Sequence, residues 1–174
     1  MSAPDSFDDL VAVADPAMVV VTTALGDERS GCLVGFHAQS SIEPRRYTVW
    51  LSRVNHTYRV ALLASHVAVH FLTDGDRALA ELFGAVTGDN VDKFARTPWT
   101  PGPAGVPLLD ACPHRLVGRR ITLVDDGGDH VAFVTEPVEA ASPGPFRPLR
   151  LAAVAGLHAG HEVDEATAPI GSAS

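Results

Sequence analysis

Gly- and Asp-rich turns between short β-branched runs constrain the fold of this chain more than any other feature. Residues 26–31 (GDERSG) separate the run 18–25 from the run 32–38, and residues 125–128 (DDGG) separate residues 114–124 from residues 129–140. Glycine adopts positive φ at little cost, and the flanking β-branched residues favour strands. The sequence therefore predicts two antiparallel hairpins.

Other segments extend this pattern into a mainly β fold. Further strands are predicted at residues 47–52, 67–73 and 148–154, and helices begin after the predicted N-caps Ser6, Asn55 and Asp74, the first ending at Pro16. Residues 97–107 contain four prolines and are predicted to form an extended loop. Hairpin-joined strands with a few inserted helices favour a β-barrel with helical decoration over a doubly wound α/β sheet. No GxGxxG or P-loop motif occurs.

Size, charge and cysteine usage narrow the class of protein. The 174 residues suit one domain over residues 1–163, with a flexible Ala-, Ser-, Thr- and Gly-rich tail at residues 164–174. A net charge of −8 argues against nucleic-acid binding, which needs a clustered basic face. Neither a secretory signal nor a membrane-spanning run is present, so the expected location is the cytoplasm. Cys32 and Cys112 are expected to be reduced, buried thiols.

The sequence gives little support to metal binding or to nucleophilic catalysis. His66 with His70, and His158 with His161, have spacings that could supply two ligands each, but neither pair has a third ligand at motif spacing and no HExxH occurs. The residue types of a Ser-His-Asp triad are present without a GxSxG elbow. The sequence predicts no metal site.

The hairpin at residues 19–31 and four short motifs after it, taken in order, resemble those of the flavin reductase-like, FMN-binding split-barrel family. The motifs are a glycine-led strand and Ser-rich loop ending in acidic-Pro (residues 31–44), Asn55-His56-Thr57 at a helix start, Asp92-Lys93-Phe94, and Gly128-Asp129-His130 entering a strand. The resemblance runs from about residue 18 to residue 138. It implies an FMN-binding split β-barrel with Greek-key-like connections.

The resemblance also implies where a flavin would bind. The isoalloxazine ring would lie against the backbone near Val34, Gly35, Phe36 and His37, and the ribityl and phosphate groups near Ser40, Ser41, Asn55, His56 and Thr57. Lys93 would be a counter-charge for the phosphate, Phe94 a ring-side contact, and His130 a contact to the flavin or the nicotinamide.

From the residues alone, several of these positions also have a simpler explanation. Gly35 could accommodate a bulge, Asn55 could be an ordinary helix cap, and Ser40 and Ser41 could be ordinary loop residues. Lys93 could be a solvated loop residue and His130 a structural histidine.

The implied function is that of an NAD(P)H-dependent flavin oxidoreductase. FMN would be the cofactor, with FAD or deazaflavin as alternatives and NAD(P)H as co-substrate, in a homodimer whose pocket lies at the subunit interface. The reduced flavin would be used on a bound substrate or released to a partner monooxygenase. No side chain need act as acid or base, and His130 is the one catalytic candidate.

Two departures from the family pattern support a second interpretation. Leu33, Gly35 and Phe36 stand where hydroxyl or small polar residues are usual, and residues 151–161 (LAAVAGLHAGH) do not carry in register the His or aromatic residue with an Arg-Gly pair that is frequent in the family's closing strand. The alternative is a non-catalytic carrier of flavin, deazaflavin or haem on the same barrel.

Overall fold

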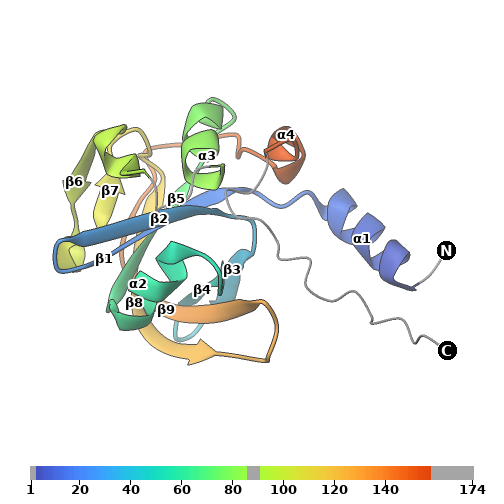
Figure 1. The fold of residues 1–174 in the computed structure, drawn as a ribbon, viewed down its shortest axis with the longest axis horizontal. Helices are drawn as coiled ribbons and strands as arrows, with labels where there is room; N and C mark the ends of the chain where they lie inside the picture. Colours follow the sequence, from blue (N-terminus) through green and yellow to red (C-terminus); the bar gives the residue numbers. More distant parts are fainter. Residues whose placement is uncertain (1–2, 86–90, 158–174) are drawn as a thin grey trace, which may run out of the picture.

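A curled antiparallel sheet of seven strands forms the body of the molecule in the computed structural model, which describes residues 3–85 and 91–157 (Figure 1). Its strand order is β2-β1-β5-β8-β9-β4-β3, and a second sheet pairs β6 with β7. The strands are β1 (Val19–Leu25), β2 (Glu28–Val34), β3 (His37–Ser41), β4 (Arg46–Ser52), β5 (His66–Phe71), β6 (Trp99–Pro101), β7 (Pro107–Leu109), β8 (Arg115–Val124) and β9 (His130–Ala141). The helices are α1 (Ala3–Ala14), α2 (His56–Leu63), α3 (Arg77–Gly84) and α4 (Leu151–Val154), with 3-10 turns η1 (Lys93–Ala95) and η2 (Pro103–Gly105). This architecture confirms the predicted mainly β fold.

Both predicted hairpins are present. β1 pairs with β2 in the register Val19↔Val34, and β8 pairs with β9 along almost their whole length. Gly26 and Gly127 have φ of +59° and +89° in the two connecting turns, the conformation for which glycine was expected there. The ends of the long sheet are therefore β2 on one side and the β3–β4 hairpin on the other.

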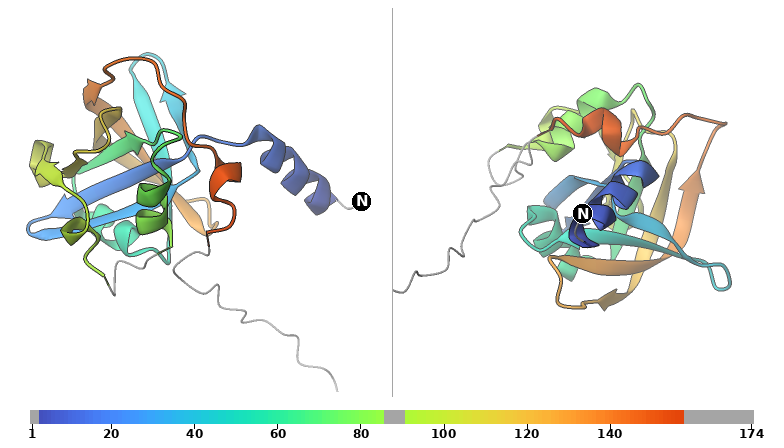
Figure 2. Two further views of the ribbon diagram at one scale, coloured as in Figure 1. Left: turned by 90° about the horizontal axis from the view of Figure 1, so that it is seen from above. Right: turned by 90° about the vertical axis from the view of Figure 1, so that its right-hand side faces the viewer.

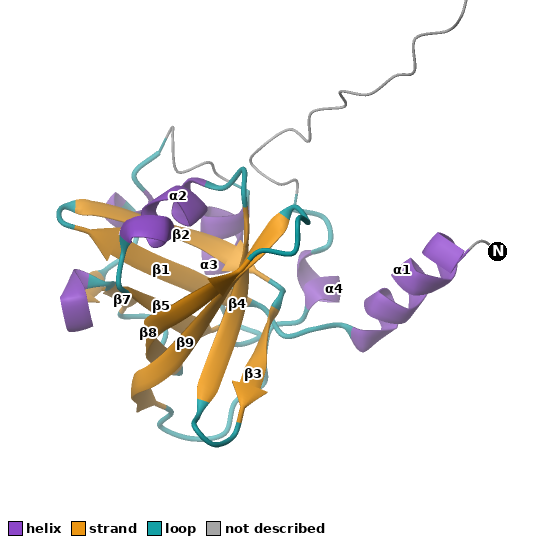
Figure 3. Cartoon of the chain, turned by 90° about the horizontal axis from the view of Figure 1, so that it is seen from below, coloured by secondary structure: helices purple, strands orange, loops and turns teal. Residues whose placement is uncertain are grey.

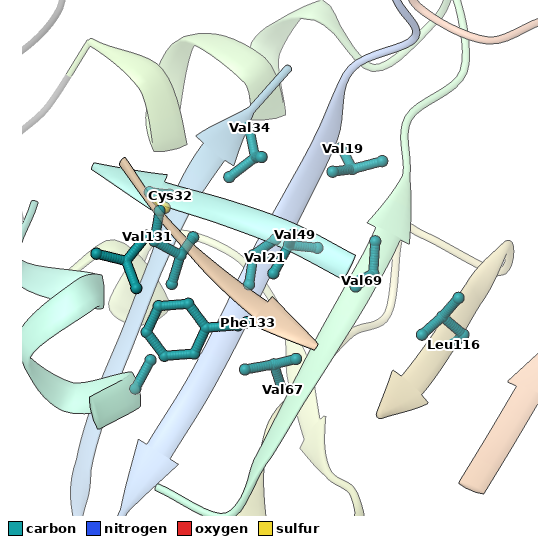
Figure 4. Close-up of a cluster of buried hydrophobic side chains, with 12 residues drawn as sticks. Val19, Val21, Cys32, Val34, Val49, Val67, Val69, Leu116, Val131 and Phe133 are labelled. Carbon is teal, nitrogen blue, oxygen red and sulfur yellow. The ribbon is translucent and has the colours of Figure 1, made fainter. Parts of the chain in front are cut away.

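The sheet is buried on both faces along β1, which explains the unbroken apolar run at its start. Alternate residues of a strand point to opposite faces. Val19 and Val21 enter the cluster inside the curl with Val49, Val69 and Phe133 (Figure 4). Val20 and Met18 instead join a second cluster, in which α3 and α4 cover the outer face. The sequences of strands that are buried on both faces are continuous hydrophobic runs, rather than alternating hydrophobic and polar residues.

Two predicted strands are wrong in their extent or type. The expected strand at residues 32–38 is divided, because β2 ends at Val34 and β3 begins at His37 on the far edge, beside β4. Gly35 and Phe36 make the crossing, and the Trp50 N–H donates to the Phe36 carbonyl at 2.9 Å. The strand expected at residues 148–154 contains only isolated bridges at Pro148 and Arg150, followed by α4, whose Leu-Ala-Ala sequence favours a helix.

The helix predictions also need correction at their N-termini. Ser6 lies inside α1, which begins at Ala3. Asp76 rather than Asp74 is the N-cap residue of α3, and its carboxylate accepts bonds from the Thr73 N–H and hydroxyl instead of from the helix. Asn55 caps α2 as predicted, accepting from the Thr57 N–H at 3.0 Å. Competing local hydrogen bonds, which composition alone does not rank, decide where such helices begin.

Residues 97–107 are less irregular than expected, since β6, η2 and the start of β7 fall in them. Within residues 3–85 and 91–157, no helix is long and apolar enough to cross a bilayer. The predicted tail from residue 164 lies outside the described residues.

Candidate functional site

A pocket of about 680 Å³ lies where β2 and β4 end and β9 begins. Its apolar lining includes Pro16, Met18, Leu33, Phe36, Trp50, Val54 and Leu151. Its polar lining is Ser52, Arg53, Asn55, Asp129 and His130. Pockets for small ligands and cofactors are typically about 300–1,000 Å³, mainly apolar, with a few placed polar groups. The pocket has the size and lining of a cofactor site.

The backbone of Leu33 faces the open edge of the sheet inside this pocket. β2 is an edge strand: among the residues that the structure describes, it pairs only with β1. The Gly31 carbonyl accepts a bond from the Lys93 Nζ at 3.1 Å, from outside the sheet. Because backbone groups of an antiparallel strand alternate sides, Leu33, two residues on, presents its N–H and C=O to the same free edge. A donor and an acceptor thus lie side by side in the pocket wall.

His130 and Phe36 form one side of the pocket. Their ring centroids lie 5.0 Å apart in an edge-to-face arrangement. The His130 Nδ1 lies 2.7 Å from the Asp129 carboxylate, and this bond holds the pKa of Asp129 below its ordinary value. Asp129 therefore fixes the orientation of the imidazole, and it leaves the other ring nitrogen free of this bond.

Arg53 ties the turn before His130 to the end of β4. Its Nε donates to the Gly128 carbonyl at 2.8 Å, and its Nη2 pairs with Asp125. The pKa of the Asp125 carboxyl group lies below its ordinary value. The main cause is the bond that it accepts from the Gly127 N–H, and the second is the Arg53 guanidinium. The backbone N–H of Arg53 also donates to the Asp129 carbonyl at 3.0 Å. These bonds set the position of His130 at the pocket.

Helix α2 begins at the pocket through Asn55, but its next two side chains point elsewhere. The His56 Nε2 lies 3.1 Å from Glu28. Thr57 is fully buried, and its hydroxyl lies 2.9 Å from that of Ser30. Of this predicted trio, only Asn55 lines the pocket.

The structure brings together five of the predicted site residues and places seven elsewhere. Val34, Gly35, Phe36, Asn55 and His130 line the pocket. The positions outside its lining are His37, Ser40, Ser41, His56, Thr57, Lys93 and Phe94.

The Ser40-Ser41 loop expected from the sequence is part of strand β3, so that expectation is wrong. Ser40 accepts a bond from the Thr48 hydroxyl at 2.7 Å, across the β3–β4 pair. His37 is also turned from the pocket: its Nε2 donates to the Ala17 carbonyl and its Nδ1 lies 2.7 Å from the Tyr47 hydroxyl. Burial lowers the pKa of His37 and raises that of Tyr47 to about 12.

Lys93 and Phe94 lie on the outer face, under α3. The Lys93 side chain is only 5% exposed, and its ammonium donates to the Gly31 and Phe83 carbonyls. Burial lowers the pKa of this amine. Phe94 packs edge-on against Phe83, with the two ring centroids 5.8 Å apart. The two side chains therefore stabilise β2 from the outer face of the sheet.

Sequence reasoning missed most of the β4 contribution to the pocket. Trp50 and Ser52 share one face of β4 with Thr48, so this face carries mostly polar residues in the sequence, and Arg53 follows them. A tryptophan on the polar face of a half-buried strand was the available signal, because such a residue needs a partner surface.

No three His, Cys, Asp or Glu side chains within the described ranges gather as a metal site would require. His70 is fully buried, its Nδ1 3.1 Å from the Val20 carbonyl while its Nε2 accepts from the Leu109 N–H. The pair His158 and His161 lies outside the described residues.

Comparison with known proteins identifies similar folds. Residues 12–152 match the family model described as flavin reductase like domain. No curated protein sequence matches the chain.

Among solved structures, a flavin reductase domain protein from Arthrobacter sp. FB24 is 21% identical, with a TM-score of 0.73 over 84% of this chain and 89% of that one. An NADH:FAD oxidoreductase of Streptomyces globisporus C-1027 is 23% identical, with a TM-score of 0.71 over 86% and 96%. An FMN-binding protein from Thermus thermophilus is 23% identical, with a TM-score of 0.67 over 72% and 69%.

Proposed function

This chain belongs to the flavin reductase-like domain family, and we propose that it is an NAD(P)H-dependent flavin oxidoreductase that holds FMN or FAD in the pocket at the end of β2. The observation that carries the proposal is the free backbone edge at Leu33, inside an otherwise apolar pocket of about 680 Å³. The names of similar solved structures, which include flavin reductase, FMN-binding protein and NADH:FAD oxidoreductase, support it.

The pocket suits a flat heterocycle with alternating donors and acceptors. The N–H and C=O of Leu33 would bond the polar edge of the ring. The apolar side chains of Met18, Phe36 and Trp50 would exclude water from its faces. Asn55 places the N-terminus of α2 at the same pocket, where the helix dipole favours a phosphate.

A bound flavin would accept hydride from NAD(P)H, and this redox chemistry belongs to the cofactor. The protein's part is to position the two rings and to exclude solvent. His130, held by Asp129, stands at the side of the pocket where it can orient a second ring over the first. Reduced flavin would then serve a bound substrate or a partner monooxygenase.

A second candidate is a binding module that holds a flavin without oxidising NAD(P)H. It is favoured by the charges of the pocket. The cations of the described lining are Arg53 and, when protonated, His130, and each is already paired with a carboxylate. A second phosphate-bearing ligand would therefore have to compete with Asp125 or Asp129.

Reconstitution separates these functions. The purified protein is mixed with FMN or FAD, affinity is measured by quenching of flavin fluorescence, and oxidation of NADH and NADPH is followed at their absorbance band. We expect binding of at least one flavin together with NAD(P)H oxidation. Flavin binding without NAD(P)H oxidation would establish the binding module, and no binding of either flavin would refute both candidates.

A matched pair of variants locates the site. Phe36→Ala removes a half-exposed ring from the pocket and should weaken flavin affinity by about tenfold, the usual effect of losing one aromatic contact. Leu63→Ala removes a comparably exposed apolar side chain from the far end of α2 and should leave affinity unchanged. Equal affinities of the two variants would place the flavin elsewhere.

A further inference from the structure

The wall of the pocket is assembled from three segments that lie far apart in the sequence. Pro16 and Met18 come from the connection between α1 and β1, Gly35 and Phe36 from the crossing between β2 and β3, and Trp50 from β4. Figure 2 and Figure 3 show the connection from α1 passing between α4 and the start of β3. Because the segments are distant in the sequence, the contacts between them set the spacing of the walls.

The His37 side chain joins all three segments. His37 is the first residue of β3 and directly follows the crossing. Its Nε2 lies 2.7 Å from the Ala17 carbonyl in the connection, and its Nδ1 lies 2.7 Å from the Tyr47 hydroxyl on β4. The imidazole also packs edge-to-face against Phe71, with the ring centroids 6.1 Å apart. The ring is therefore held on several sides at the place where the segments meet.

The two hydrogen-bond partners fix the tautomer of His37. A backbone carbonyl only accepts hydrogen bonds, so Nε2 carries the hydrogen in the bond to Ala17. In a neutral imidazole the other ring nitrogen is then an acceptor, and the Tyr47 hydroxyl donates to it. Burial lowers the pKa of His37, which keeps the ring neutral at neutral pH. Each ring nitrogen thus makes one bond of a defined direction.

The bond to Ala17 lies beside a direct contact between two of the walls. A Cβ on Gly35 would lie 3.4 Å from the Met18 sulfur, so the crossing and the connection already touch there. Met18 follows Ala17, and Gly35 lies two residues before His37. Glycine permits the close approach, and the hydrogen bond one residue away fixes its distance.

We propose that His37 is a positioning residue of the flavin site, and that its Nε2–H bond to the Ala17 carbonyl sets the spacing between the connection at residues 16–18 and Phe36. This inference rests on the proposed function, because it concerns the affinity of the same pocket for FMN or FAD. His37 does not line the pocket, so it acts through its neighbours in the sequence. The Phe36 side chain is 52% exposed, so the position of its ring depends on the backbone that carries it. Binding groups must be held within about 0.5 Å of the productive geometry by the residues behind them.

Two amide variants separate the two bonds of His37. The Nε2 of glutamine reaches the place of the imidazole Nε2, so His37→Gln keeps the donor to Ala17 and loses the bond from Tyr47. The Oδ1 of asparagine reaches the place of the imidazole Nδ1, so His37→Asn keeps the acceptor for Tyr47 and loses the donor to Ala17. Each variant lacks one hydrogen bond, and their midpoints of urea unfolding should therefore be similar.

Flavin affinity should differ between these equally stable variants. Measured by quenching of flavin fluorescence, the dissociation constant for FMN or FAD should be about tenfold higher in His37→Asn than in His37→Gln. His37→Gln should remain close to the wild type. A residue that served stability alone would change both affinities equally. Equal affinities of the two variants, or weaker binding by His37→Gln, would overturn the positioning role.

Amide hydrogen exchange without any flavin keeps this inference separate from the proposed function. The reporters are the Leu151 N–H, which donates to the Pro16 carbonyl, and the Trp50 N–H, which donates to the Phe36 carbonyl. Relative to amides in the centre of β1, both should exchange faster in His37→Asn than in His37→Gln. This result in a protein that binds neither flavin would refute the proposed function and retain the role of His37 in the pocket wall. Equal exchange in the two variants would overturn that role whether or not a flavin binds.

Discussion

Lys93, the only lysine in the chain, is predicted to stabilise the fold by fastening β2 to α3. Its ammonium donates to the Gly31 carbonyl on β2 at 3.1 Å and to the Phe83 carbonyl near the end of α3 at 3.2 Å. It also lies 5.5 Å from the Phe83 ring centroid. Lys93→Met keeps the length of the side chain and removes every one of these polar contacts, so the variant isolates their contribution.

The expected loss follows from the two bonds and the cost of burying the charge. A hydrogen bond to a charged group contributes about 1.5–3 kcal/mol, so losing both costs about 3–6 kcal/mol. Because methionine is uncharged, the variant does not have the desolvation cost of a buried ammonium, and this offsets the loss of stability by several kcal/mol. We therefore expect Lys93→Met to lower the free energy of unfolding by about 2 kcal/mol, the difference between these opposing effects.

Urea unfolding followed by tryptophan fluorescence measures this change. Arg96→Met is the matched control, because Arg96 is an exposed cation three residues away and its loss should cost less than about 0.5 kcal/mol. An amine-specific reagent gives an independent reading, since apart from the N-terminus it can label only Lys93. Labelling should be slow in the native chain and fast in urea. Unchanged stability in Lys93→Met, or rapid native labelling, would refute the anchoring role.

Two further predictions concern the core. Burial lowers the pKa of His70 to about 4, so the unfolded chain binds a proton first as pH falls; stability should drop by about 2 kcal/mol between pH 7 and pH 5 in urea titrations. His70→Gln should flatten that dependence, and an unchanged slope would assign it to other groups. Gly118→Ala would place a Cβ 2.6 Å from that of Thr135, whose hydroxyl bonds the Tyr47 carbonyl, and should cost about 2–3 kcal/mol. Gly144→Ala, in open space, is its control, and equal unfolding midpoints would contradict the packing argument.

The hairpins were predictable because the residues that specify them lie close together in the sequence. Turn glycines and flanking β-branched runs lie within a few residues of each other, and both hairpins form as expected. The end of β2 was not predictable in this way. No residue between Cys32 and Ala38 forbids one continuous strand, and the break depends on Phe36 reaching Trp50, fourteen positions away in the sequence.

The site residues predicted from motifs divide by their place in the fold: those at the edge of the pocket line it, and others face the interior of the protein. Asn55 and His130 begin elements that start at the pocket, so their position in the motif fixes their place in space. Thr57 lies two residues after Asn55 and Lys93 lies one residue after Asp92 in their motifs, and both are buried. Residue type gives no warning of this, because a hydroxyl or an ammonium suits a phosphate and a buried carbonyl equally well.

The absence of hydroxyl residues at Leu33, at the end of β2, and at Gly35 and Phe36, which follow it, has a different meaning once β2 is seen in place. The Leu33 side chain packs into the outer cluster beside Gly84, while its backbone faces the pocket. Side chains and backbone groups of an edge strand point in perpendicular directions. The hydrogen-bonding capacity of this wall is therefore independent of which side chains the strand carries, and it depends instead on keeping β2 extended and in register with β1. Lys93 therefore affects the pocket although it does not line it. Weakening its bond to the Gly31 carbonyl should displace the Leu33 backbone at the edge of β2 without any change to a pocket residue.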